Sequence, residues 1–97
     1  MKNQLMFEHF KPSYADQQLC TNHFSMIEDL APADSTIQMI VKKMADGTFH
    51  TIIDIKAFCG KFYSEAQDIA SLKSIQIAKK SILGKISDWK SLRFKTT

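Results

Sequence analysis

The sequence of 97 residues is poor in glycine and proline and has no long apolar run, and each shortage excludes a class of protein. Three glycines and two prolines are too few for collagen-like or low-complexity sequence. No stretch approaches the roughly 18 apolar residues that a membrane-spanning helix needs. The apolar share of 44% and the charged share of 24% are typical of globular proteins, so we expect one folded domain over residues 1–97.

Cysteine and histidine are also scarce, with two and three copies. Cys20 and Cys59 lack the CxxC spacing of a metal or redox site, and the histidines lack the spacing of helical metal ligands. No HExxH, GxSxG or glycine-rich phosphate loop is present. We therefore expect a protein without enzymatic activity, metal, cofactor or small-molecule substrate.

The N-terminus does not have the pattern of a secretory signal peptide, because Glu8 comes before any long apolar run. We therefore expect a cytoplasmic protein that does not bind membranes and that keeps both thiols reduced.

Charge is distributed unevenly along the chain. Residues 1–34 hold two lysines against five carboxylates, whereas residues 73–97 hold seven lysines and arginines against Asp88 alone. This asymmetry indicates a polyanionic partner that binds mainly the C-terminal segment. A lysine face that only keeps the protein soluble is the alternative.

The first part of the chain predicts a short strand over residues 5–10 and a helix over residues 14–30. Ser13 is placed to cap that helix, with Asp16 as the acidic residue three positions later. Apolar residues recur at helical spacing up to the Ala31-Pro32 pair, where the proline ends the helix.

After residue 35 the apolar period changes from helical to two, which predicts three antiparallel strands. The strands cover about residues 37–42, 49–58 and 61–66, with Asp46-Gly47 and Cys59-Gly60 in the two turns.

A last helix is predicted from Asp68, as its N-cap, to about Leu92. The order β-α-β-β-β-α predicts an α+β sandwich, a four-stranded sheet with two helices packed on one face. The residues that we expect in the core are Leu5, Phe7, Leu19, Ile27, Val41, Ile53, Ile55, Ile75, Ile82 and Trp89.

Two surfaces are candidates for binding. One candidate surface is the C-terminal helix, whose basic side chains suit a phosphate backbone: Lys73, Lys79, Lys80, Lys85, Lys90 and Arg93. The second is the sheet face away from the helices, where aromatics and lysines are typical of single-strand RNA platforms: Lys42, Lys56, Phe58 and Tyr63. That sheet face could equally form a homodimer contact.

Several segments resemble one family when they are taken in order. Gln4-Leu5 is similar to the start of its first strand, and Ser13-Tyr14-Ala15 with residues 23–30 is similar to its first helix. The closest stretch, residues 60–69, resembles the final strand and the turn into a lysine-rich helix. Over about residues 4–93 the chain thus resembles the ribosome hibernation promoting factor and ribosome-associated inhibitor family.

The resemblance implies a non-enzymatic factor that binds ribosomal RNA of the small subunit in the channel used by messenger and transfer RNAs. It implies inhibition of translation in stressed or stationary-phase cells. We expect the short form of the family, which lacks a C-terminal dimerisation domain.

The sequence departs from the family in both helices. The first helix has uncharged residues where the family carries lysines, namely Gln17, Gln18, Asn22 and His23. In the last helix, a gapless match from Asp68 places Lys79 at a basic position but Lys80 and Gly84 at buried leucine positions. The resemblance therefore implies a basic helix rather than a role for each lysine.

Two alternatives stay open. The element order also resembles a double-stranded-RNA-binding domain, although residues 67–71 lack the lysine cluster that such domains carry. The acidic first helix favours instead a degenerate family member that binds another protein.

Overall fold

The computed structural model describes residues 3–95 and confirms the predicted α+β class and element order. Within those residues it contains four strands and two helices. Their bounds are β1 (Gln4–Glu8), α1 (Tyr14–Leu30), β2 (Thr36–Lys43), β3 (Phe49–Ala57), β4 (Gly60–Asp68) and α2 (Ser71–Lys95).

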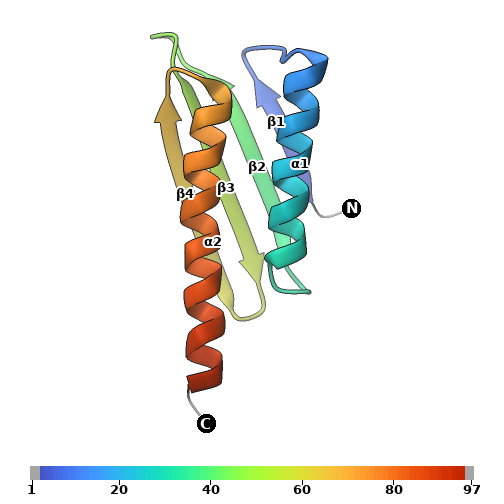
Figure 1. The fold of residues 1–97 in the computed structure, drawn as a ribbon, viewed down its shortest axis with the longest axis vertical. Helices are drawn as coiled ribbons and strands as arrows, with labels where there is room; N and C mark the ends of the chain where they lie inside the picture. The colour runs from blue at the N-terminus through green and yellow to red at the C-terminus, as the bar shows by residue number, and fades with distance from the viewer. Residues whose placement is uncertain (1–2, 96–97) are drawn as a thin grey trace.

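The strands form one sheet in the order β1-β2-β3-β4. β1 is parallel to β2, and α1 is the crossover that a parallel pair requires, whereas the other two pairs are antiparallel. Figure 1 shows both helices on the same face of the sheet, running in the same direction. The opposite face of the sheet, which no helix covers, is called the open face below.

The ends of α1 follow the sequence signals. The Ser13 side chain accepts a hydrogen bond from the Asp16 backbone N–H at 3.2 Å, which confirms the predicted N-cap. The helix stops at Leu30, and the Ala31 N–H still bonds the Ile27 carbonyl at 2.9 Å before Pro32.

Both predicted hairpins are present with different turns. Between β2 and β3 the loop is wider than two residues, since the Met44 N–H bonds the Thr48 carbonyl, and Gly47 has a φ of 89°. Between β3 and β4 the turn residues are Phe58 and Cys59 instead of Cys59 and Gly60. Gly60 begins β4 with a φ of 141°, a conformation that favours glycine.

The core lies between the sheet and the two helices and confirms most of the expected residues. Ile27, Val41, Ile53, Ile55, Ile75 and Ile82 are buried, and Leu5, Phe7 and Trp89 are half-buried against them. The prediction that Leu19 belongs to the core is wrong, because 44% of this residue is exposed. The helix instead buries Cys20, Phe24 and Ile27, at spacings of four and three.

The start and end of α2 also differ from the prediction. Asp68 ends β4, and its side chain accepts the Ala70 N–H at 3.1 Å, so it closes the turn instead of capping the helix. α2 begins at Ser71 and continues to Lys95, beyond the end expected near Leu92.

Small hydroxyl residues lie buried between α2 and the sheet, which hydrophobic patterning did not predict. The Thr51 and Ser74 hydroxyls are 2.7 Å apart, and Ser64 donates to the Ala78 carbonyl at 2.8 Å. Each buried hydroxyl therefore has the partner that it needs away from water. Their small size lets the helix backbone lie close to β3 and β4.

Candidate nucleic-acid interface

The lysines of α2 point in different directions, because the helix turns by about 100° per residue. The side of α2 that faces the sheet forms a buried stripe of Ser74, Ile75, Ala78, Ile82 and Ile86. Lys73 and Lys80 are exposed on the opposite side of the helix. They are seven residues apart, about two turns, so they form one row along the helix. Among the described side chains neither makes a hydrogen bond or ion pair, which leaves both ammonium groups available to an anion.

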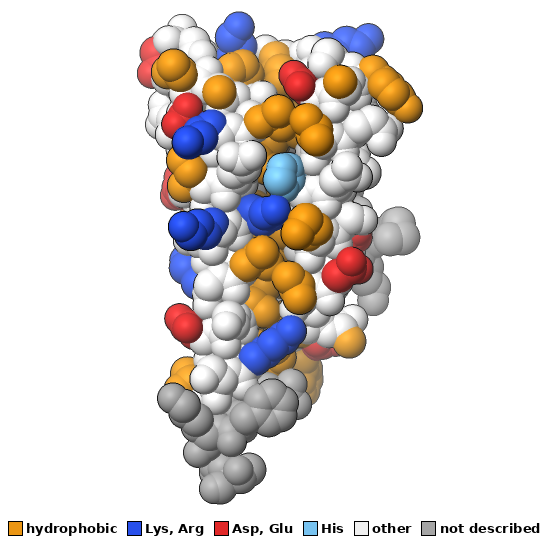
Figure 2. Space-filling model, in the orientation of Figure 1, with side chains coloured by type: hydrophobic (Ala, Val, Ile, Leu, Met, Phe, Trp, Pro, Cys, Tyr) orange, Lys and Arg blue, Asp and Glu red, His pale blue; other side chains and the backbone are white. Residues whose placement is uncertain are grey.

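Lys79 lies in the seam between the helices instead. Its Nζ lies 2.9 Å from Nδ1 of His23 on α1 and donates to the Met26 sulfur at 3.6 Å. An ammonium group has only donors, so Nδ1 of His23 is the acceptor and the imidazole is neutral. Figure 2 shows a histidine and Lys or Arg side chains together in this seam, with apolar side chains above and below them.

The surroundings of His23 stabilise this neutral form. Partial burial, followed by the positive charge of Lys79, lowers the pKa of His23 below its usual value. Protonation would remove the acceptor on Nδ1 and place two positive charges side by side. The contact therefore holds Lys79 against α1 while His23 is neutral.

Lys85 and Lys90 flank the buried stripe on opposite sides. The Lys85 ammonium donates to the backbone carbonyl of Tyr63 on β4, the edge strand, so it covers part of that edge. Lys90 is half-buried near the end of α2. Arg93 belongs to α2, but its side chain lies outside the described residues. The six predicted residues thus do not form one continuous patch.

α1 contributes no positive charge beside α2, because it contains no lysine or arginine. Gln17, Gln18 and Asn22 are exposed, as are the carboxylates Glu28 and Asp29. The basic surface of the helical layer is therefore confined to α2.

The open face carries charges of both signs, and the cross-strand register places one opposite-charge pair, Lys42 and Glu8, side by side, whereas Lys56 faces Lys61. Lys42 pairs with Glu8 on one side and His50 on the other, and Asp54 pairs with Tyr63. Opposite charges at such cross-strand positions attract each other and weaken the attraction for an outside anion.

Glu65 makes two side-chain contacts on the open face. Nε2 of His50 lies 2.6 Å from its Oε1, and the Tyr63 hydroxyl donates to its Oε2 at 3.2 Å. Desolvation, then the hydrogen bond and negative charge of Glu65, and then the charge of Asp54 raise the pKa of Tyr63. A phosphate near Tyr63 would meet the same two carboxylates.

The four secondary candidates are not gathered at one place. Lys42 and Tyr63 lie in different strands, and Lys56 is paired with Lys61 near the far end of the sheet. Phe58, expected on the sheet, lies in the β3–β4 turn and is 97% exposed. The homodimer contact through this face stays a prediction.

Sequence reasoning missed two contacts that decide how free the charges are. The His23–Lys79 pair joins two helices, and helical periodicity within each helix does not predict their relative rotation. The His50–Glu65 contact could have been predicted from the sequence, because the alternation of the two strands places both residues on the open face.

The two thiols have opposite environments. Cys20 is buried in α1, where burial, with a smaller contribution from Asp16, raises the pKa of its thiol to about 11. Cys59 is exposed in the β3–β4 turn.

Across residues 3–95, no three histidine, cysteine, aspartate or glutamate residues are grouped to hold a metal ion. No helix in that range is long and apolar enough to cross a membrane.

The fold is that of ribosomal subunit interface proteins. A ribosomal subunit interface protein from Coxiella burnetii has a TM-score of 0.74 and 14% identity, over 94% of this chain and 99% of its own. The Thermus thermophilus Protein Y N-terminal domain has a TM-score of 0.72 and 11% identity, over 92% of this chain and 99% of that domain. No family model and no curated protein matches the sequence. These similarities confirm the fold that the sequence resemblance implies.

Proposed function

We propose that this protein is a non-enzymatic, cytoplasmic, ribosome-associated factor that binds ribosomal RNA of the small subunit and inhibits translation under stress or in stationary phase. The observation that carries the proposal is the exposed Lys73–Lys80 row on a fold shared with a ribosomal subunit interface protein. Lysines in such a row bind phosphates by charge without reading base sequence.

The shape of the molecule supports the same function. Its principal extents are 48, 26 and 19 Å, and α2 runs along the long axis (Figure 1). A narrow body with lysines along one side suits a cleft whose walls are lined with phosphates. Lys73, Lys80, Lys90 and Arg93 are the residues that we assign to direct phosphate contact. Lys79 and Lys85 join them only by leaving their present partners.

Sedimentation of the purified protein with isolated small subunits through a sucrose gradient tests the proposal. We expect co-sedimentation at low salt, weaker co-sedimentation as salt rises, and none with large subunits. Addition of the protein to a cell-free translation reaction should lower the yield. Protein that stays at the top of the gradient at low salt would reject the ribosomal function.

A protein-interaction module is the second candidate, and the seam side of α1 favours it. Leu19, Met26 and Leu30 are 44%, 47% and 42% exposed along one side of that helix. Such an apolar stripe on an acidic helix fits an apolar protein surface better than a phosphate backbone. Capture of a protein that Met26→Glu abolishes, with no subunit binding, would favour this candidate.

A further inference from the structure

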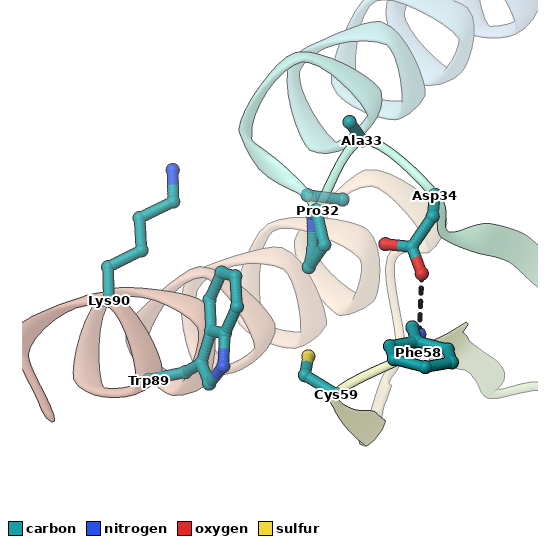
Figure 3. A pocket seen from close by; sticks show the side chains of 8 residues that line it. Pro32, Ala33, Asp34, Phe58, Cys59, Trp89 and Lys90 are labelled. Atoms are coloured by element: carbon teal, nitrogen blue, oxygen red, sulfur yellow. Dashed lines mark hydrogen bonds between the residues drawn. The ribbon is translucent and has the colours of Figure 1, made fainter. Parts of the chain in front are cut away.

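An open hollow lies at the end of the molecule where α1 and β3 stop and the last turns of α2 pass. Its walls come from the segment 31–34, the β3–β4 turn, Trp89 and Lys90, and its volume is about 490 Å3. Small-molecule sites have volumes of about 300–1,000 Å3. Figure 3 shows Phe58 and Trp89 on opposite sides of Cys59, with Pro32 between them on the α1 side.

Phe58 is unusual because a large apolar ring is held almost entirely in solvent. It is 97% exposed, yet its backbone is fixed, since its N–H donates to Asp34 Oδ2 at 2.7 Å. That bond joins the β3–β4 turn to the segment after α1 (Figure 3). A ring on a fixed backbone loses little conformational freedom when a ligand packs on it.

The opposite wall is equally well held. Trp89 is half-buried, and its ring packs edge-on against Phe62 of the core, with ring centroids 6.0 Å apart. Lys90 follows it in α2 and provides the positive charge among the residues that line the hollow. The site thus combines an exposed aromatic ring on a held backbone, a second ring packed against the core, and one cation.

We infer that this hollow binds one unpaired nucleotide of single-stranded RNA, with the base against Phe58 and Trp89 and the phosphate at Lys90. The inference rests on the proposed ribosomal function and specifies which RNA feature this end of the protein meets. Aromatic rings are the platforms on which proteins stack bases that are not paired in a helix. Lys90 belongs to the same helix as Lys73 and Lys80 but lies on a different side of it, so the nucleotide would be bound apart from the Lys73–Lys80 row.

The charges around the hollow favour a nucleotide over a purely apolar occupant. The carboxylate of Asp34 lies on the Phe58 side and is already engaged, and the base that would pack there is neutral. The phosphate is placed at Lys90 on the other wall. A purely apolar protein segment would leave the Lys90 charge unused and partly desolvated.

Trp89 gives a direct measurement, because it is the single tryptophan of the chain. The probe is single-stranded oligoadenylate of about ten nucleotides, within the usual site size of small single-strand binders. A blunt RNA duplex of the same length is the control. We expect the single strand to change Trp89 fluorescence with a saturable curve, and the duplex to leave it unchanged.

Variants separate stacking from charge. Phe58→Ala should weaken binding about 5- to 150-fold, whereas Phe58→Tyr should restore it. Lys90→Gln should lower the salt slope by about 0.7, the value of one single-strand phosphate contact. Because the Phe58 side chain is exposed, Phe58→Ala should unfold at the wild-type temperature. Tyr63→Ala, on the open face, is the matched control and should bind as wild type.

The outcomes distinguish this inference from the proposed function. Subunit binding that Phe58→Ala leaves unchanged, with no Trp89 response to the single strand, would overturn the inference and leave the function intact. A Phe58-dependent Trp89 response without subunit binding would support the site and reject the ribosomal function. Self-association that Phe58→Ala abolishes, with no response to RNA, would overturn the inference in favour of a second copy.

Discussion

The helical layer and the open face both carry lysines but place them differently. Residues 71–92 of α2 hold five lysines against one aspartate, and two of these lysines point away from every other element. On the open face, Lys42, Lys56 and Lys61 share the surface with Glu8, Asp54 and Glu65. An anion therefore meets uncompensated charge on one side and mixed charge on the other.

The difference follows from the geometry of helices and sheets. Side chains on neighbouring strands stand about 5 Å apart, so charges on one face of a sheet readily meet opposite charges. The outer side of a helix that lies on a sheet has no neighbour. The comparison teaches that the number of lysines in an element is a poor guide to a phosphate site, because the element's surroundings decide how many remain unpaired.

The largest expected effect separates the two faces of β3. Ile53 is fully buried beneath the helices, whereas Ile52 is half-buried on the open face. We expect Ile53→Ala to lower the free energy of unfolding by about 2–5 kcal/mol. Ile52→Ala should lower it by about 1 kcal/mol or less. Urea denaturation followed by circular dichroism measures both, and equal losses would contradict the assigned faces.

The fold was largely predictable because its signals are local. The alternation in residues 36–57, the cap at Ser13 and Gly47 in the first hairpin loop each specify backbone geometry within a few residues. The misplaced residue, Leu19, shows the limit of this approach. Leu19 and Cys20 both fit an apolar stripe on α1, but the packing of α1 against the sheet and α2 buries the smaller Cys20 and leaves Leu19 exposed.

The candidate site was predictable only in outline. A basic last helix can be recognised from charge alone, but Lys79 and Lys85 have partners on α1 and β4 that no pattern within α2 reveals. The hollow beside Phe58 combines segments that are up to 59 residues apart, from Ala31 to Lys90. Such a site depends on how the elements pack, and spacing along the chain does not encode it.

The second prediction compares the charges of the two layers. The double reversal Lys73→Glu/Lys80→Glu changes ammonium groups without partners, so the fold should keep its stability. Affinity for small subunits should fall about tenfold, and the salt slope should decrease by about 0.7–0.9 for each lost phosphate contact. Fluorescence anisotropy of labelled protein against subunits over a salt series measures both.

Lys56→Glu/Lys61→Glu is the matched control, since it makes the same change in charge on the open face. It should alter the affinity and the salt slope much less. Equal losses from the two double variants would mean that net charge alone attracts the protein, and the assignment to α2 would fail.

The third prediction concerns pH and the seam of the helical layer. The pKa of His23 is lowered in the folded protein, so below about pH 6.5 the unfolded state takes up a proton first. The contribution of His23 to stability is therefore present above pH 6.5 and is lost as pH falls through its folded pKa. Above pH 6.5 the residue is neutral in both states and adds no pH dependence.

Lys79→Gln tests the cause of this shift, because it removes the positive charge beside His23. The NMR titration midpoint of the His23 imidazole should rise, and the loss of stability on acidification should become smaller. Burial, the larger cause, remains in the variant, so the midpoint should stay below the ordinary value. Lys80→Gln changes the adjacent, outward lysine and should leave the midpoint unchanged. A midpoint that moves equally in both variants would contradict the seam contact.

The smallest expected effect is at Tyr63, the aromatic residue of the open face. Tyr63→Ala removes a ring that is 45% exposed and the hydroxyl that donates to Glu65. If RNA stacked on this ring, the change would cost about 1–3 kcal/mol of binding free energy. We expect affinity within about twofold of wild type, because a phosphate beside Tyr63 would be repelled by Asp54 and Glu65, the carboxylates that also raise its pKa. Anisotropy against small subunits at low salt is the measurement, since repulsion is least screened there. A loss as large as that of a stacked base would transfer the RNA interface from α2 to the open face.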